Sequence, residues 1–181
     1  MEILNCNLDG VRIIKHDIHG DNRGYFVETF NKEKLPFLPE FKQSNMSFSR
    51  INVLRGLHYQ ETQPQGKLVT VMDGCAFDAI VNINPNHPQF GKWFGIKLKP
   101  GISMWVPPFY AHGFYTLDET IFSYHCSDLY KSGDGKVIDW NSCGIDWPID
   151  EEFKKIGPFM SNQDSEGELF INFAARMLRN G

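Results

Sequence analysis

The stretch VLRGLHYQ, residues 53–60, has the apolar character of a core β-strand, yet it carries a guanidinium, an imidazole and an amide. Side chains alternate between the two faces of an extended strand, so simple alternation would place Arg55 and His58 on opposite faces. An isolated glycine in a strand often marks a bulge that re-aims the next side chains, and Gly56 lies between the two. The stretch is therefore either an edge strand with solvated polar groups or one wall of a binding pocket.

Similar short runs, separated by turn signals, extend to about Trp140. They are GVRIIKH (10–16), GYFVETF (24–30), KQSNMSFS (42–49), GKLVTVM (66–72), CAFDAIVNI (75–83), KWFGIKL (92–98), SMWVPP (103–108), HGFYTL (112–117) and IFSYHCSDLY (121–130). NKEKLPFL (31–38) is broken by Pro36, so at most a short helix is expected there. Many short strands at close, even spacing predict an all-β antiparallel sandwich or barrel.

A longer helix is predicted only near the C-terminus. In ELFINFAARMLRN (168–180), Leu169, Phe170, Phe173 and Met177 recur at spacings of three and four. This helix could pack on the barrel or on a partner subunit.

Several strands pair a polar face with an apolar one. Gln43, Asn45, Ser47 and Ser49 share one face of their strand, Lys67 shares a face with Val69 and Val71, and Asp78 lies opposite Phe77, Ala79, Val81 and Ile83. A solvated outer face explains such a row in any one strand. Several rows together, interleaved with aromatic residues, favour a wet ligand cavity inside the barrel.

Bulk composition narrows the class of protein. A chain of 181 residues fits one domain, 1–181, and a net charge of −4 argues against a general nucleic-acid binder. The four cysteines form no CxxC pair, which argues against a zinc site or a disulfide framework. The N-terminus resembles no secretory signal, and no apolar run is long enough for a membrane span. We expect a cytoplasmic protein that binds neither nucleic acid nor membrane.

An ordered set of motifs gives a more specific reading. DNRGYFVETF (21–30), QSNMSFS (43–49), VLRGLHYQ (53–60), QGKLVTVMDG (65–74), FDAIVNI (77–83), PPFYAHGF (107–114), SYHCSDLY (123–130), GIDWP (144–148) and SNQD (161–164) resemble, in order, the motifs of the dTDP-4-dehydrorhamnose 3,5-epimerase family. The resemblance implies a cupin-type β-barrel (jelly roll) without metal or cofactor that forms homodimers. It also implies inversion of carbon centres beside the ketone of a nucleotide-diphosphate-linked 4-keto-6-deoxy sugar.

The resemblance assigns roles to individual residues. His58 matches the catalytic base, Asp164 the carboxylate that orients it, and Tyr124 the acid on the opposite face of the sugar. The positions that match substrate-binding residues are Arg23, Glu28, Gln43, Asn45, Ser47, Arg55, Lys67, Asp78, His112, Tyr130 and Gln163. Among these, Tyr130 matches an aromatic residue that stacks on the base. In the family, the segment that here carries Arg23 and Glu28 reaches the neighbouring subunit's site.

These residue types also suit the proposed chemistry when they are judged independently of the family resemblance. A hydrogen beside a ketone is weakly acidic, so its removal needs a placed base and stabilisation of the enolate oxygen. His58 suits the role of base because an imidazole generally titrates near operating pH, and Lys67 supplies positive charge where the enolate oxygen develops. Inversion then needs a proton from the other face, which is the task assigned to Tyr124.

The chain departs from the family pattern in its ligand-holding residues. Gln163 replaces a lysine, Asn82 and Asn84 replace an aspartate and an arginine, and Asp134 is the nearest counterpart of an acidic residue after Tyr130. The segment between His112 and Tyr124 is one residue shorter than expected. The nucleotide, the sugar and the choice of carbon 3, carbon 5 or both therefore stay open.

Two other function classes are compatible with a β-barrel of this kind. A metal-dependent cupin isomerase or dioxygenase commonly uses an H-x-H pair and a later histidine, but the residue two after His58 is Gln60. For His16 and His19 we expect a solvated loop rather than a metal site. A non-catalytic sugar-binding barrel would not need a histidine–aspartate pair facing a tyrosine, but the sequence leaves it open.

Overall fold

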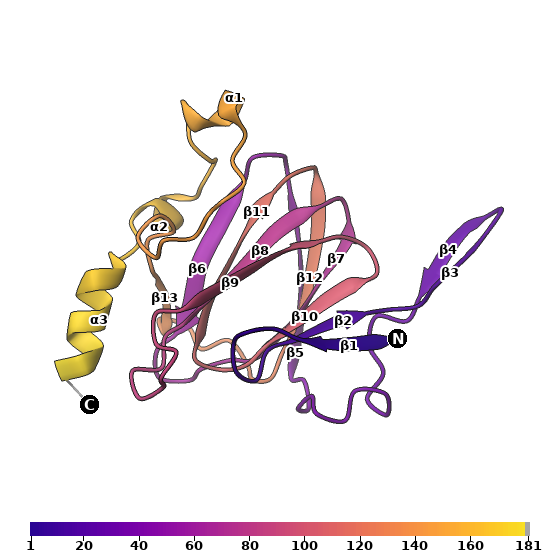
Figure 1. The fold of residues 1–181 in the computed structure, drawn as a ribbon, viewed down its shortest axis with the longest axis horizontal. Coiled ribbons are helices and arrows are strands. Elements are labelled where there is room, and N and C mark those ends of the chain that lie inside the picture. The colour runs from indigo at the N-terminus through magenta and orange to yellow at the C-terminus, as the bar shows by residue number, and fades with distance from the viewer. Residues whose placement is uncertain (180–181) are drawn as a thin grey trace.

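The computed structural model describes residues 1–179. The predicted helical stretch ends at Asn180 and the predicted domain at Gly181, and these two residues lie outside the described part. Two antiparallel sheets face each other (Figure 1). One contains, in order, β1 (Glu2–Asn5), β2 (Arg12–Lys15), β10 (Ile102–Val106), β7 (Lys67–Asp73), β12 (Thr120–Cys126) and β5 (Gln43–Ser49). The other contains β13 (Gly135–Val137), β6 (Leu54–Gln60), β11 (Tyr110–Thr116), β8 (Ala76–Asn82) and β9 (Trp93–Leu98). The predicted all-β antiparallel barrel is confirmed.

A separate hairpin, β3 (Ile18–Asp21) and β4 (Gly24–Val27), projects away from the barrel (Figure 1). Three short helices follow the strands: α1 (Glu151–Lys154), α2 (Asn162–Ser165) and α3 (Phe170–Arg179). The sequence reading did not identify β1, β3, β13, α1 or α2, which are three or four residues long and too short for a periodic pattern. Residues 31–38 form turns rather than a helix, and only the first four residues of 24–30 are a strand.

The core lies between the two sheets. Ile80 and Phe114 from one sheet meet Val69, Met104 and Phe122 from the other, all at most 5% exposed. The Phe114 and Phe122 rings stack with centroids 4.2 Å apart, which joins β11 to β12 across the barrel. Burying each such side chain contributes about 1.5–3 kcal/mol.

Each sheet is also covered in part on its outer face. On the five-stranded sheet, Phe173 of α3 is fully buried against Tyr59 and Phe90, so the C-terminal helix packs on its own barrel. On the six-stranded sheet, Leu35 and Leu38 cover the outer side of β2 and β7. Beyond this cover, Met46 and Phe48 on the edge strand β5 are 72% and 56% exposed.

His16 is buried, so the expected solvated loop is wrong for this residue. His19 is exposed as expected, but it lies in strand β3 rather than in a loop. The alternation of β2 continues past its last residue, which places His16 on the covered face beside Ile14. Its Nε2 atom lies 2.8 Å from the Ser103 hydroxyl, which in turn lies 2.7 Å from that of Thr70.

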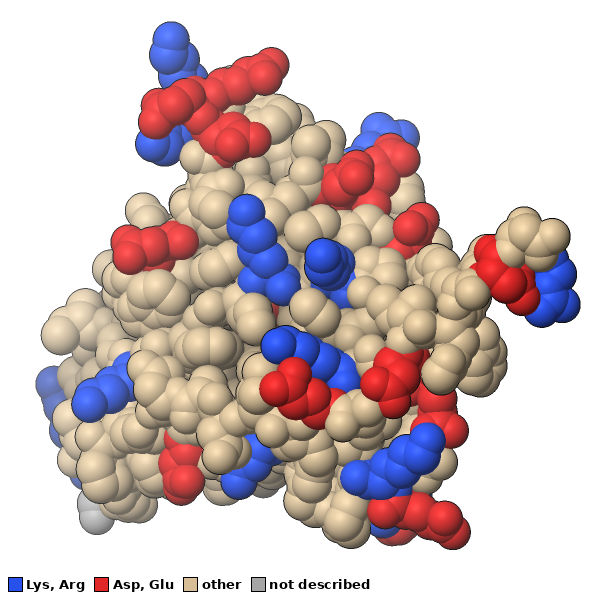
Figure 2. All heavy atoms as spheres, turned by 45° about the vertical axis from the view of Figure 1, so that its right-hand side comes forward, with Lys and Arg blue, Asp and Glu red and all other residues tan. Residues whose placement is uncertain are grey.

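Positive and negative side chains are interspersed on the face shown in Figure 2. None of the helices within residues 1–179 combines the length and the apolar character that a membrane span requires.

Candidate active site

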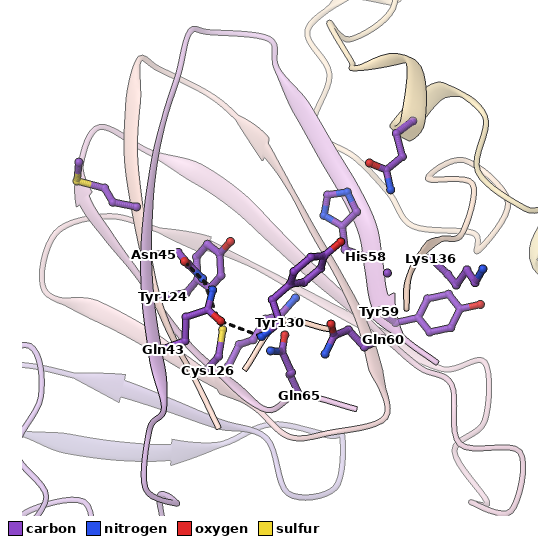
Figure 3. A pocket seen from close by; sticks show the side chains of 14 residues that line it. Gln43, Asn45, His58, Tyr59, Gln60, Gln65, Tyr124, Cys126, Tyr130 and Lys136 are labelled. Atoms are coloured by element: carbon purple, nitrogen blue, oxygen red, sulfur yellow. Dashed lines mark hydrogen bonds between the residues drawn. The ribbon is translucent and has the colours of Figure 1, made fainter. Parts of the chain in front are cut away.

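A cavity of about 440 Å³ opens between the two sheets (Figure 3). Its walls come from β5, β6, β7, β12 and β13, from the loops between them and from α2. The lining residues are Gln43, Asn45, Met46, His58, Tyr59, Gln60, Gln65, Lys67, Tyr124, Cys126, Tyr130, Gly135, Lys136 and Gln163. The polar row predicted on β5 faces inward, because Gln43, Asn45 and Ser47 are partly buried while the residues between them are exposed.

The bulge predicted at Gly56 is confirmed. His58 pairs with His112 and Arg55 with Phe114, so three steps along β6 oppose two along β11. A Cβ atom on Gly56 would lie 2.6 Å from the carbonyl oxygen of His112, and the glycine has φ of +111°, so no other residue fits without strain. The extra residue explains how a strand with an apolar core pattern can turn His58 toward the cavity.

His58 forms a dyad with Asp164, which is 4% exposed. The His58 Nε2 atom lies 2.6 Å from Asp164 Oδ1, and that oxygen also accepts the Gly56 amide at 3.1 Å. The Ser161 hydroxyl donates to Oδ2 at 2.8 Å and accepts the Asp164 amide, so it also caps α2. The carboxylate is thus held from three directions.

The hydrogen bonds to Asp164 decide its charge. Burial raises the pKa of Asp164, but the hydrogen bonds from His58, Ser161 and the Gly56 amide outweigh burial and leave that pKa below its usual range. An ionised carboxylate requires His58 to donate through Nε2, so the neutral tautomer that fits this contact carries its lone pair on Nδ1. The His58 side chain is 41% exposed, and Nδ1 has no partner among the described residues.

Tyr124 and Lys67 occupy the other wall. They lie on the adjacent strands β12 and β7, and the Lys67 ammonium lies 5.9 Å from the centre of the Tyr124 ring. Burial raises the pKa of the Tyr124 hydroxyl, so this group is a proton donor at neutral pH. Burial lowers the pKa of Lys67, whereas the charge of Asp78 opposes that shift.

Asp78 and His112 lie next to the cavity without lining it. The His112 Nε2 atom lies 2.5 Å from Asp78 Oδ1, and the Asp78 side chain is fully buried. Its second oxygen, Oδ2, has no hydrogen-bond partner in the described part of the chain. Burial raises the pKa of Asp78, and the nearby His112 and Lys67 oppose this.

Arg55 also lies beside the cavity rather than in its lining. Its Nε atom donates to the Ser49 hydroxyl at 3.0 Å, and its Nη2 atom donates to the Phe48 carbonyl at 3.2 Å. The guanidinium is close enough to Tyr124 to oppose the rise in that residue's pKa.

Gln43, Asn45 and Tyr130 form a linked group at the cavity mouth (Figure 3). The Gln43 side-chain amide donates to Asn45 Oδ1 at 3.0 Å, and its oxygen accepts the Tyr130 backbone amide at 2.8 Å. Tyr130 is 58% exposed, so its ring is available to a ligand. Gln163 is exposed at the rim, one residue before Asp164 on α2.

Arg23 and Glu28 do not reach the cavity of their own chain. Arg23 lies in the β3–β4 turn, 85% exposed, with its guanidinium 2.6 Å from Asp21. Glu28 follows β4 and lies 2.7 Å from the Lys34 ammonium.

Several lining residues were missed from sequence: Met46, Tyr59, Gln60, Gln65, Cys126, Gly135 and Lys136. Gln60 and Cys126 could have been found by alternation, since each lies two residues after His58 or Tyr124 on the same strand. Gln65 lies in a loop and Lys136 in a three-residue strand, where the sequence offers no face pattern. Within residues 1–179, no three His, Cys, Asp or Glu side chains gather as a metal-ligand set.

Comparison with known proteins gives a consistent result. The family model described as dTDP-4-dehydrorhamnose 3,5-epimerase matches residues 5–172. The enzyme of that name from Methanothermobacter thermautotrophicus is 40% identical over 155 residues, which cover 81% of this chain and 84% of the relative. The one from Shigella flexneri is 37% identical over 182 residues, which cover 95% and 97%.

A solved structure of a similar enzyme also resembles this chain in its fold. It is the crystal structure of dTDP-6-deoxy-D-glucose-3,5-epimerase from Legionella pneumophila Philadelphia 1 in complex with dTDP-4-keto-L-rhamnose. The TM-score is 0.88 at 37% identity, and the match covers 97% of this chain and 96% of that one. The similarity therefore extends over the whole barrel and includes the elements that carry the cavity.

Proposed function

The chain belongs to the dTDP-4-dehydrorhamnose 3,5-epimerase family, and we propose that it is a cofactor-independent isomerase acting on a dTDP-linked 4-keto-6-deoxy sugar. It inverts carbon 3, carbon 5 or both by removing a proton beside the ketone and returning one from the opposite face. The observation that carries this proposal is the His58–Asp164 dyad on one wall of a cavity whose other wall holds Tyr124.

His58 is the base. Its Nδ1 atom takes the carbon-bound proton, and the ionised Asp164 stabilises the imidazolium that forms. Such a positioned acid–base group contributes roughly 100- to 10,000-fold to the rate.

Lys67 and Tyr124 complete the reaction from the other wall. The charged Lys67 stabilises the oxygen of the enolate, where negative charge develops after proton removal. Tyr124, whose raised pKa keeps its hydroxyl protonated, then donates a proton to the opposite face of the carbon. Asp78 and His112 lie on β8 and β11 of the five-stranded sheet, the sheet that carries His58, and Asp78 opposes the lowering of the Lys67 pKa from across the barrel.

The nucleotide binds at the cavity mouth. Its base stacks on the exposed Tyr130 ring, and its sugar–diphosphate portion lies between Gln43 and Asn45 on one side and Gln163 on the other, with Ser47 farther along the inward row of β5. Arg55 adds a positive charge near the sugar end of the site.

The working enzyme is a homodimer in which Arg23 and Glu28 of one subunit complete the site of the other. The projecting β3–β4 hairpin supports this arrangement, because Tyr25 and Phe26 are 58% and 67% exposed there. Met46 and Phe48 add exposed apolar surface on the unpaired edge strand β5. We propose residues 1–181 as a single domain that works in the cytoplasm.

The experiment is incubation with a dTDP-linked 4-keto-6-deoxy sugar in heavy water, followed by measurement of the mass and position of incorporated deuterium. Label at carbon 3, carbon 5 or both, with and without a chelator, is the expected result. Activity that a chelator abolishes and added metal restores would instead favour a metal-dependent cupin. Tight binding without label would indicate a sugar-binding barrel.

A further inference from the structure

The segment that carries Tyr130 crosses from one sheet to the other at the cavity mouth. It leaves the six-stranded sheet after Cys126, the end of β12, and enters the five-stranded sheet at Gly135, the start of β13. The 61–66 loop makes the reverse crossing, from β6 to β7. The Ser127 amide donates to the Gly66 carbonyl at 2.9 Å, so the two loops lie side by side.

Three glutamine side chains hold this crossing segment through hydrogen bonds of 2.7–2.9 Å. The amides of Tyr130 and Lys131 donate to Gln43 Oε1 at 2.8 Å and to Gln60 Oε1 at 2.9 Å. Gln65 donates from Nε2 to the Asp128 carbonyl at 2.7 Å. Gln43 comes from the six-stranded sheet and Gln60 from the five-stranded sheet, so two consecutive backbone amides are tied to opposite walls of the cavity.

Gln60 is the central member of this set. It is 7% exposed, and both ends of its side chain are occupied, because Nε2 donates to the Gln63 carbonyl at 2.9 Å. Loss of the side chain would leave the Lys131 amide without its acceptor, which is costly at a part-buried site. Side-chain amides do not titrate, so the attachment is independent of pH.

The attachment fixes an aromatic ring. A Cβ atom on Gly135 would lie 3.4 Å from the Tyr130 hydroxyl and 3.5 Å from its ring, so the ring lies over the start of β13. The backbone of Tyr130 and Lys131 is thus held from both sheets, while Tyr130 lines the cavity and stays 58% exposed to solvent.

We propose that Gln60 and Gln65, together with Gln43, are positioning residues that hold Tyr130 in place for a nucleotide base to stack on it. The proposal rests on the proposed function, because it takes the ligand to be a nucleotide-linked sugar. Gln60 and Gln65 act on nucleotide affinity through Tyr130, whereas Gln43 also faces the ligand, and none of the three takes part in proton transfer.

The test is a double-mutant cycle read by dTDP binding in calorimetry. Gln60→Leu, checked for folding by circular dichroism, should weaken dTDP binding roughly two- to tenfold and raise KM more than it lowers kcat. In a Tyr130→Ala background, Gln60→Leu should cause no further loss of affinity. Gln63→Leu is the matched control, because its side-chain amide reaches the Leu129 carbonyl only at 3.5 Å, and it should bind dTDP as wild type does.

The inference is overturned if Gln60→Leu binds dTDP as tightly as wild type. It is also overturned if the double variant loses dTDP affinity by the full product of the two single-variant factors, because the two residues would then act independently. Should Gln60→Leu fail to fold, Gln65→Leu runs the same cycle. A wild-type protein that binds dTDP but exchanges no deuterium would contradict the proposed function and leave this inference standing. A wild-type protein that binds no dTDP would contradict both.

Discussion

The Nε2 atom of His58 lies 2.6 Å from Oδ1 of Asp164, although 106 positions separate the two residues along the chain. Gly56, the bulge residue of β6, donates its amide to the same oxygen at 3.1 Å. The bulge at Gly56, which turns His58 toward the cavity, therefore also holds the carboxylate of Asp164 that orients the His58 ring.

This arrangement predicts how stability responds to acid. The pKa of Asp164 is lower in the folded chain than the value of about 3.9 expected when unfolded, so its stabilising contribution is complete above about pH 4 and is lost as pH falls through the folded pKa. Asp164→Asn should therefore lose less stability than wild type between pH 5 and pH 3. Urea unfolding at both pH values measures this; an equal loss in the two proteins would contradict it.

A second prediction concerns the charge on Lys67. Burial lowers the pKa of Lys67 and the charge of Asp78 opposes this, so Asp78→Asn should lower that pKa further. In the proposed mechanism Lys67 stabilises the enolate only when it is protonated, so the alkaline limb of the kcat/KM profile should move to lower pH. An unmoved limb in a folded, active variant would show that Asp78 has no such role.

A third prediction concerns Gln163 at the cavity rim. Gln163→Lys adds a positive charge near the proposed diphosphate position and should lower KM severalfold for dTDP-linked substrate at low ionic strength. Screening should reduce the gain in high salt. The same assay with GDP-, CDP- and UDP-linked 4-keto sugars measures nucleotide preference, and a preference for dTDP is expected in both proteins. A KM unaffected by the substitution would place the diphosphate away from α2.

A fourth prediction tests the shared site. Arg23→Ala should weaken ligand binding while the dimer persists. If Arg23 acts on the partner's site, mixing Arg23→Ala with His58→Ala subunits should restore part of the activity, because each mixed dimer then has one intact site. Mixed dimers that stay inactive, or an active monomer, would refute the arrangement.

Alternation along strands predicted much of the cavity wall. The inward row of β5 and the placement of Lys67 follow from a two-residue period, and Gly56 indicated the bulge because an isolated glycine in a strand often marks one. The family resemblance, rather than any local pattern, supplied the pairing of His58 with Asp164. Local rules cannot specify a contact between a strand and a four-residue helix so far apart in sequence.

Other features depended on tertiary context. His16 was misread because its immediate neighbours, Lys15 and Asp17, are polar, whereas the structure buries its ring on the face of β2 that also carries Ile14. The role of Gln60 could not be predicted from the sequence, because a side-chain amide at the end of a strand is usually solvated. Its hydrogen-bond partner, the Lys131 backbone amide, also lies 71 residues away along the chain.

The central claim is that His58 removes a carbon-bound proton and Tyr124 returns one from the opposite face. The direct measurement is deuterium incorporation from heavy water into the bound sugar, compared among wild type, His58→Ala and Tyr124→Phe. His58→Ala should abolish incorporation, because no enolate forms without the base. Tyr124→Phe should still incorporate label at the first carbon, since His58 can return a deuteron to the same face, but inversion should be impaired. Normal incorporation in His58→Ala, or inversion at the wild-type rate in Tyr124→Phe, would contradict the account.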